Sequence, residues 1–346
     1  MRPEWKAWGR RIITGEARGV GPTLARAGLA VASWGYGAGV RAIRAAYAVG
    51  LCRPQRLPRP VVSIGNLTWG GTGKTPLTAH LARALAQRGL RVAIITRGYG
   101  ADEPQVLRRL APGIPVIIGR DRVAAGRQAV AEGADLLLVD DGFQHWRLHR
   151  DLDIVLVDAT APFGNGRMIP RGPLREPVTH LRRAEVVIVT RAEVPTADVA
   201  GVVARVRAIH PGATVLTARA RPTQLEEWPV ELVQPFSIVQ GVRVCALSGI
   251  GNPAAFEAVV AQTGAVVALT SRFADHHLYQ TRDLERVVAQ CRAAGVSWIV
   301  TTLKDAARLP PPATWSAGLH VAVLHMTMEL TGESELLQRL AALRAR

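Results

Sequence analysis

The segment that most constrains the fold of this chain is GGTGKT, residues 70–75. It follows an apolar run at 61–66 that reads as a buried strand, and it opens a helix-forming run over 74–88 that Gly89 closes. Glycines let a loop curl so that its N–H groups point at phosphate oxygens, and a helix N-terminus adds positive potential. A strand, a glycine-rich loop and a helix in this order are the context that a phosphate-binding loop requires. The residues that we expect to bind a nucleotide are Gly70, Gly71, Thr72, Gly73, Lys74 and Thr75.

Lysine is rare in this chain: Lys6, Lys74 and Lys304 are its only lysines among 43 basic residues. We expect Lys74 to reach the outer phosphates and the Thr75 hydroxyl to ligate Mg²⁺. The loop departs from the usual pattern at Thr68, which occupies the place of the first glycine, and the double glycine at 70–71 supplies the flexibility instead. The competing interpretation is a glycine-rich turn that binds nothing.

Apolar runs continue after this loop and alternate with helical patterns. Further strands are predicted at 92–96, 136–141, 154–159 and 186–191, and Asp121 is expected to cap a helix that runs to Glu132. This alternation indicates an α/β fold of the P-loop NTPase type, with a doubly wound and mainly parallel sheet. The expected domain divisions are a helical segment at 1–55, a P-loop kinase domain at 56–222, a linker or hinge at 223–240 and a smaller α/β domain at 241–346. The stretch around 220–240 reads either as a linker or as a hairpin. The last helix, over 333–346, could pack on either domain.

A pair of acidic residues ends the strand predicted at 136–141. Asp140 and Asp141 would lie at the carboxyl edge of the sheet, where open α/β sheets bind ligands. One carboxylate is expected to hold Mg²⁺ and the other to orient the substrate or a second ion. The alternative is a pair of turn-forming aspartates, because glycine follows them. Asp158 ends the next strand and is a weaker candidate that could simply terminate it.

The loop does not by itself distinguish ATP from GTP. A guanine site needs an Asn/Thr-Lys-x-Asp run after a late strand, and the run at 190–193 is Thr-Arg-Ala-Glu, with the wrong residues for Lys and Asp. We therefore expect ATP with Mg²⁺ as the cofactors. The formal net charge is +16, but no basic block with interleaved aromatic residues suggests nucleic acid. The three cysteines are far apart in the sequence and show no metal-binding spacing, and the start of the chain does not look like a cleaved signal peptide.

Residues 20–50 are unusual for a soluble enzyme. Their uninterrupted apolar stretch, 27–40, is shorter than the roughly 20 residues that a spanning helix needs. Arginines flank it, and Trp5, Trp8, Trp34 and Tyr36 are of the kind found at a lipid–water boundary. These features indicate a membrane-associated helix that lies on or dips into a bilayer. A helix buried against the catalytic domain is an equal alternative, and both can hold for one helix.

Several longer motifs resemble the tetraacyldisaccharide 4'-kinase family, the lipid A 4'-kinases of Gram-negative bacteria. They run in order from about residue 60 to 310 and include VVSIGNLTWGGTGKTP, TRGYG, DEP, VDDGFQHW, GNGRMIPRGPLREP, SGIGNP, FADHH and TTLKDAARL. The resemblance implies that the γ-phosphoryl group of ATP goes to the 4'-hydroxyl of a tetraacyl disaccharide 1-phosphate. It also implies a lipid A precursor and the inner-membrane surface as partners at the cytoplasmic face, with no nucleic acid and no obligate protein partner.

The same resemblance assigns roles to residues. Asp102, in DEP, would activate the 4'-hydroxyl, and His276, the first histidine of FADHH, would be its partner in the second domain, with Lys74 as the third catalytic residue. The metal site would comprise Thr75, Asp140 and Asp141. The substrate and nucleotide cleft would be lined by Arg97, Glu103, Gln144 and His145. As a separate hypothesis, Arg175 in the GPLREP loop could contact the 1-phosphate of the substrate or anionic headgroups.

Two features depart from the family pattern. The segment between TRGYG and DEP is almost absent, and Leu303 stands where relatives usually have an acid. The chief rival function is a P-loop ATPase or GTPase switch, or a metallochaperone, without a phosphoacceptor. A membrane-bound module with a vestigial P-loop is the other, and Lys74, Thr75, Asp140 and Asp141 argue against it.

Overall fold

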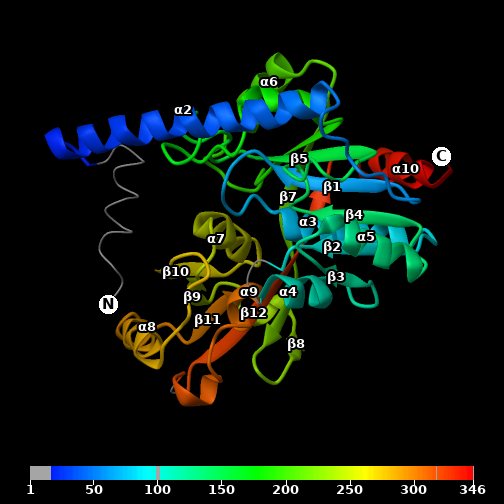
Figure 1. Cartoon of the computed structure of the whole chain (residues 1–346). Coiled ribbons are helices and arrows are strands. Elements are labelled where there is room, and N and C mark those ends of the chain that lie inside the picture. The colour runs from blue at the N-terminus through cyan, green and yellow to red at the C-terminus, as the bar shows by residue number, and fades with distance from the viewer. Residues whose placement is uncertain (1–16, 99–101, 317, 346) are drawn as a thin grey trace.

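A twelve-stranded sheet runs through the part of the chain that the structure describes. The computed structural model describes residues 17–98, 102–316 and 318–345, and Figure 1 shows their arrangement. The strand order is β10-β9-β11-β12-β7-β6-β5-β1-β4-β2-β3, and β8 pairs with β7. Two α/β units share this sheet, one around the phosphate loop and a smaller one built from the later part of the chain.

The first unit is the parallel half of the sheet. Its strands are β1 (Val61–Asn66), β2 (Val92–Thr96), β3 (Val116–Ile118), β4 (Leu136–Asp140), β5 (Leu152–Asp158) and β6 (Val186–Thr190). Every residue of β1, β2, β4, β5 and β6 is buried, as expected for strands covered on both faces. The sequence predictions for these five strands are confirmed. The edge strand β3 was missed because three residues give too short an apolar signal.

Helices cover both faces of this half. They are α3 (Lys74–Ala86), α4 (Asp102–Leu110), α5 (Arg122–Ala131), α6 (Val199–Ile209) and the 3₁₀ helix η1 (Val178–Arg183). The side chain of Asp121 accepts from the N–H groups of Val123 and Ala124 and caps α5, as predicted. One core cluster joins α3 and α4 to the sheet, and others lie under α5 and α6, so the fold is the doubly wound α/β arrangement that the alternation predicted.

The second unit is smaller and also mainly parallel. It contains β9 (Arg243–Ser248), β10 (Val266–Arg272), β11 (Trp298–Thr302) and β12 (His320–Leu330). Its helices are α7 (Pro253–Gln262), α8 (Thr281–Ala293) and α9 (Leu303–Ala306), with short 3₁₀ turns η2 (Phe236–Ile238) and η3 (Pro312–Thr314). Cores on either side of β9 and β11 hold these helices to the strands.

The two units are joined by a long strand rather than by an irregular linker. β7 (Thr214–Glu227) begins parallel to β6 and continues antiparallel to β12, and β8 (Leu232–Gln234) then folds back on it. Of the two interpretations of this segment, linker or hairpin, the structure shows the hairpin of β7 and β8. The pattern was hidden because Pro222 interrupts it, at a register shift opposite Met326 where a ladder hydrogen bond is not required.

The last helix returns to the first unit. α10 (Glu333–Ala342), with the 3₁₀ turn η4 (Leu343–Ala345), buries Leu336, Leu337 and Leu340 in the same core as α3. The sequence did not decide on which domain the last helix packs. In the structure, it packs on the first unit.

The N-terminal helix α2 (Val20–Ala48) lies along the outside of the first unit, and one end projects beyond the body of the molecule (Figure 1). Only Ser33 and Gly37 of this helix are buried. It is anchored by the Ser33 hydroxyl on the Met168 carbonyl at 2.9 Å and by the Tyr36 hydroxyl on the Arg175 carbonyl at 3.0 Å. The helix therefore packs on the first unit through one narrow face, and most of its surface is exposed. Among the described residues, no helix is both long and apolar enough to cross a bilayer. Trp5 and Trp8 lie outside the described residues.

Candidate active site

The phosphate loop lies at the carboxyl edge of the first unit, between β1 and α3. Gly70 and Gly73 adopt left-handed backbone conformations, with φ of 125° and 91°, and Gly73 is the N-cap of α3. These two positions require glycine. Thr68 is bridged to Leu174 in an antiparallel pairing, and the Trp69 N–H donates to the Pro173 carbonyl at 2.7 Å. An extended residue needs no glycine, which explains why Thr68 can replace the first glycine of the motif.

Neighbouring strand ends hold the backbone of this loop. The Asn66 amide donates to the Thr72 hydroxyl at 2.9 Å and to the Gly70 carbonyl at 3.4 Å. From the end of β6, the Thr190 hydroxyl donates to the Thr72 carbonyl at 3.0 Å. The loop is thus built to one conformation by buried side chains, as a preformed anion site needs.

Asp140 lies where the sequence predicted a metal ligand. Its carboxylate accepts from the hydroxyls of Thr75 and Thr78, both at 3.3 Å, and the residue is 3% exposed. The pKa of Asp140 is raised to about 6, because burial raises it by more than the positive charge of Lys74 lowers it. A buried carboxylate beside a threonine hydroxyl fits Mg²⁺, which takes one or two protein oxygens and completes its shell with phosphate and water. The described residues contain no cluster of three or more His, Cys, Asp or Glu side chains suited to a metal ion.

Asp141 has a different environment from its neighbour. It is in the left-handed region at φ 54°, 3.6 Å from the Lys74 ammonium, and it accepts from the Arg175 guanidinium at 2.9 and 2.8 Å. Burial would raise the pKa of Asp141, but the hydrogen bonds from Arg175 and the charge of Lys74 lower it well below its usual range. The acid pair therefore divides into a carboxyl that is costly to ionise and one held firmly ionised.

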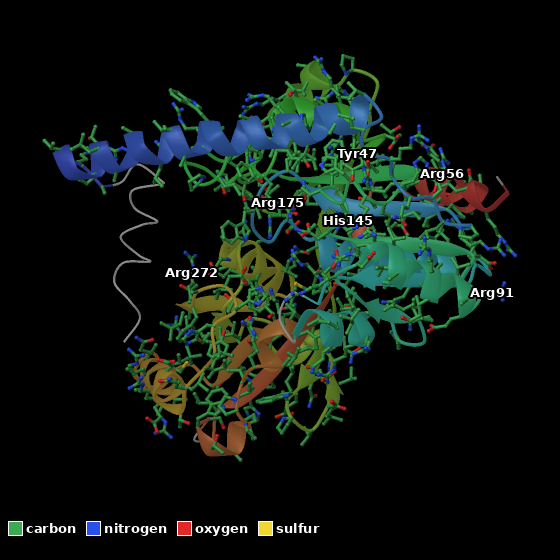
Figure 2. The ribbon with its side chains drawn as sticks, in the orientation of Figure 1. Tyr47, Arg56, Arg91, His145, Arg175 and Arg272 are labelled. Carbon is green, nitrogen blue, oxygen red and sulfur yellow. The ribbon has the colours of Figure 1, made fainter. Side chains whose placement is uncertain are left out.

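Arg175, expected among the substrate residues, is engaged within the protein. Besides Asp141, its guanidinium donates to the side-chain oxygen of Asn66. Its backbone carbonyl accepts from Tyr36 of α2, so the loop that carries it links that helix to the acid pair. Figure 2 shows Arg175 and His145 below α2.

Gln144 and His145 follow the acid pair on the loop after β4. The Gln144 amide donates to the Asn66 carbonyl at 3.0 Å. Burial, with help from the positive charges of Arg122 and Arg150, lowers the pKa of His145, so its imidazole is neutral at neutral pH. The Gln144 Oε1 and the His145 Nε2 are buried without a hydrogen-bond partner in the structure. Unpaired buried polar atoms are rare, and here they mark groups that a ligand or water could satisfy.

Arg97, Asp102 and Glu103 lie at the two ends of the connection from β2 to α4. Arg97 follows β2 and is exposed. Asp102 and Glu103 begin α4, and their side chains lie outside the described part of the chain. Their relation to the phosphate loop therefore remains a prediction.

The second unit places His276 near the phosphate loop. His276 has a left-handed backbone, φ 57°, and its Nε2 lies 3.2 Å from the Lys304 ammonium, which also lies 3.4 Å from Asp275. The Cα of Gly251, in the SGIGNP loop, approaches the phosphate loop so closely that a Cβ there would lie 3.1 Å from the Gly71 nitrogen. The same Cβ would lie 3.5 Å from the Asp275 carboxylate, so the loop at 248–253 borders the phosphate loop on one side and the loop at 273–277 on another.

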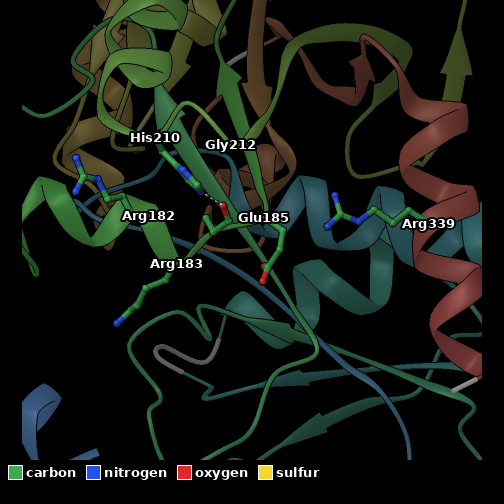
Figure 3. A pocket seen from close by; sticks show the side chains of 7 residues that line it. Arg182, Arg183, Glu185, His210, Gly212 and Arg339 are labelled. Carbon is green, nitrogen blue, oxygen red and sulfur yellow. Dashed lines mark hydrogen bonds between the residues drawn. The ribbon is translucent and has the colours of Figure 1, made fainter. Parts of the chain in front are cut away.

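Two hollows in the described part of the chain are not lined by residues 70–75. One, of about 370 Å³, is bounded by α2 and by residues 166–179. The other, of about 280 Å³, lies near the amino end of β6 and is lined by Arg182, Glu185, His210 and Arg339 among others (Figure 3). The His210 ring contacts the Ala184 carbonyl there at 3.1 Å. The amino end is opposite the edge that holds the phosphate loop, so this second hollow is not the candidate site.

Sequence reasoning missed several residues of the site. Asn66, Arg191 and Asn252 hold loops in place through hydrogen bonds that no local motif reveals. Lys304 could have been suspected, because it is one of only three lysines in an arginine-rich chain.

Comparisons with known proteins identify the family of this chain. The profile of the family described as Tetraacyldisaccharide-1-P 4'-kinase matches residues 25–344. A tetraacyldisaccharide 4'-kinase from Geobacter metallireducens is 41% identical over 87% of this chain and 93% of its own length. One from Anaeromyxobacter dehalogenans is 40% identical over 85% of this chain and 84% of its own length.

A solved structure gives the same result. The crystal structure of LpxK from Aquifex aeolicus in complex with ATP matches with a TM-score of 0.69 and 26% identity, and it covers 92% of this chain and 99% of that one. The family match spans the phosphate loop, the acid pair and the second unit. This chain therefore belongs to the tetraacyldisaccharide 4'-kinase family.

Proposed function

We propose that this protein transfers the γ-phosphoryl group of ATP to the 4'-hydroxyl of a tetraacyldisaccharide 1-phosphate, a step of lipid A biosynthesis. The products are ADP and the 4'-phosphate ester, and the hydroxyl proton is released. The observation that carries the proposal is the phosphate loop with Lys74, Thr75 and the buried Asp140 at one edge of the sheet, in a chain of this family. The relatives that bear the kinase name span most of this chain.

The residues of the first unit would bind and polarise the nucleotide. The loop amides and Lys74 would hold the phosphate oxygens and stabilise the negative charge that spreads over them during transfer. Thr75 and Asp140 would hold Mg²⁺, which supplies further charge neutralisation at the phosphates. Asp141 is kept ionised and in place by Arg175, so it can orient Lys74 or a metal-bound water.

A sugar hydroxyl is a poor nucleophile at neutral pH, and a positioned base typically contributes about 10²- to 10⁴-fold in rate. Asp102 is the proposed base, with His276 as its partner from the second unit. Lys304 would act on this pair, because a charged ammonium at 3.2 Å from His276 Nε2 favours an imidazole that accepts at that nitrogen. A base from one unit and a partner from the other are expected to meet when the units enclose the substrate.

The acceptor is an amphiphile, and α2 supplies a matching surface. Trp34 is 70% exposed, and Val20, Leu24, Val31 and Ile43 are also exposed on this helix. Arg26, Arg41 and Arg44 flank its apolar stretch, and each charge near an anionic bilayer contributes about 1 kcal/mol. We propose that α2 lies on the cytoplasmic face of the inner membrane and that the hollow of about 370 Å³ beside it faces the lipid substrate.

Acceptor-dependent turnover separates this function from an ATPase switch. ADP release is measured with and without the tetraacyl disaccharide 1-phosphate, and the lipid product is analysed by ³¹P NMR for a new phosphomonoester at the 4' position. We expect ADP release to require the lipid and to match product formation mole for mole. Turnover that is equal without the lipid, with no new phosphomonoester, would support the switch instead.

A further inference from the structure

A chain of hydrogen bonds connects the second unit to the phosphate loop. The Asn252 amide, at the start of α7, donates to the Thr160 hydroxyl at 2.9 Å, and that hydroxyl donates to the Asp158 carboxylate at 2.6 Å. The other carboxylate oxygen of Asp158 accepts from Arg191 Nε at 2.6 Å. Arg191 Nη2 in turn donates to the Gly71 carbonyl of the phosphate loop. In this series of hydrogen bonds each donor meets an acceptor, and no two donors or two acceptors face each other.

The contact at Gly71 determines where the loop amides point. A carbonyl and the following N–H share one planar trans peptide unit and point in opposite directions. Arg191 holds the Gly71 carbonyl, and Thr190 holds the Thr72 carbonyl at 3.0 Å, both from the end of β6. The N–H groups of Thr72 and Gly73 are therefore turned away from β6, as phosphate binding by this loop requires.

The backbone of Arg191 supports a functional reading. The described non-glycine residues with positive φ are Asp141, Arg191, Glu231 and His276. Asp141 and His276 belong to the candidate site, and Glu231 lies at the β7–β8 turn. A side chain held in this region costs free energy, and such positions cluster at functional sites. Arg191 and Asp158 are also largely buried, with side-chain exposures of 14% and 12%, so their ion pair is well screened from water.

We propose that Arg191 is a positioning residue of the phosphate loop and that Asn252 supports it from the second unit through Thr160 and Asp158. Tight nucleotide binding by the first unit thus depends on a hydrogen bond made by the second. The proposal rests on the proposed use of ATP. It gives a role to the Thr-Arg-Ala-Glu run, which occupies the place of a guanine motif without its residues, and to Asp158, whose function the sequence left open.

Three substitutions break the chain at different points while keeping local structure. In the wild type, the side-chain Oδ1 of Asn252 accepts from the Ala255 N–H and caps α7. Asn252→Ser keeps this cap, because a serine hydroxyl can accept in the same way, but it removes the amide group that donates to Thr160. Thr160→Val removes the hydroxyl at nearly constant shape, and Thr160→Ser restores it. Arg191→Lys keeps the charge, but one ammonium cannot reproduce the two-pronged contact with Asp158 and Gly71. Arg219→Lys is the matched control, because Arg219 makes an exposed two-pronged pair with Glu329 on β12, at 2.9 Å for both contacts.

The first readout is binding of a non-hydrolysable ATP analogue with Mg²⁺ in the absence of lipid, by titration calorimetry. We expect Kd to rise about 10-fold in Arg191→Lys and about 3-fold in Asn252→Ser and Thr160→Val, from the usual strength of hydrogen bonds to charged groups. Thr160→Ser and Arg219→Lys should bind like the wild type. The double variant Asn252→Ser/Arg191→Lys should bind the analogue no more weakly than Arg191→Lys alone, because both changes interrupt the same series of hydrogen bonds.

The second readout is hydrogen exchange of a peptide over residues 66–77 in the nucleotide-free protein. We expect faster exchange there in Thr160→Val and Asn252→Ser, at an unchanged melting temperature, and wild-type exchange in Thr160→Ser. Wild-type Kd and exchange in Thr160→Val and Asn252→Ser, or additive effects in the double variant, would overturn the inference. A wild-type protein that binds no analogue would instead contradict the proposed function itself.

Discussion

Replacing Asp140 by asparagine should make the nucleotide-free protein more stable at neutral pH while abolishing its activity. Burial raises the pKa of this carboxyl from its ordinary 3.8 to about 6, which corresponds to about 3 kcal/mol of cost for holding it ionised. Asparagine keeps a hydrogen-bonding group beside Thr75 and Thr78 without the charge. The site would thus be less stable in exchange for the charge that is proposed to hold Mg²⁺, as is common at functional sites.

The pH dependence of this effect follows from the direction of the shift. Between pH 4 and 6 the carboxyl of the unfolded wild type loses its proton while the folded one retains it, so wild-type stability falls as pH rises. Above about pH 6 both are ionised and the full cost is present. The stabilisation by Asp140→Asn should therefore be near zero at pH 4 and reach about 3 kcal/mol at pH 7.5.

Urea unfolding in EDTA across this pH range measures the difference directly. Asp141→Asn is the control with the opposite sign, because Arg175 and Lys74 lower the pKa of Asp141, so its loss should destabilise the protein evenly from pH 5 to 8. The reasoning would be refuted if Asp140→Asn were less stable than the wild type at pH 7.5. It would also be refuted if the difference in unfolding free energy between the two proteins were the same at pH 4 and pH 7.5.

Three further substitutions each test the role of one residue. Arg175→Lys should lower kcat by about 10-fold with little change in the KM for lipid, because Arg175 holds Asp141 and Asn66; a raised lipid KM at constant kcat would instead favour the substrate role expected from the sequence. Gly251→Ala should raise the KM for ATP, because its Cβ would lie 3.1 Å from the Gly71 nitrogen; Gly35→Ala, whose Cβ meets nothing within 4 Å, should not, and equal KM values would contradict the close approach. Trp34→Ser should weaken co-sedimentation with anionic lipid vesicles by about 10-fold at unchanged helix content by circular dichroism, and unchanged sedimentation would exclude Trp34 from a membrane contact.

Local patterns were sufficient to predict most of the first unit. Its main strands are apolar on both faces and end at residues with strong turn or ligand character, so β1 and β4 could be placed from the sequence within one residue. The phosphate loop and the Asp140–Thr75 contact follow from the same edge-of-sheet argument. These features depend on neighbours in sequence or on one parallel pairing.

Features that depend on distant contacts could not be predicted. β7 looked like a linker because its pairing with β12 joins residues about 100 positions apart and includes Pro222 at a register shift. The pKa values of Asp140 and Asp141 shift in opposite directions because Asp140 is buried and because Arg175, from a loop that is far away in sequence, donates to Asp141. The exposure of each α2 residue depends on whether it contacts the loop at 166–179. The sequence of an apolar helix does not show which of its faces makes such a contact.

The central claim is that the loop at 70–75 binds a triphosphate whose terminal group is passed to a lipid-borne sugar. Its most direct test is transfer of label from [γ-³²P]ATP to the tetraacyl disaccharide 1-phosphate, with the wild type and Lys74→Ala measured side by side. We expect labelled lipid from the wild type and a loss of at least about 10²-fold in Lys74→Ala, since Lys74 would stabilise the charge on the transferred group. Wild-type protein that labels no lipid, or a Lys74→Ala protein that labels it at the wild-type rate, would contradict the account.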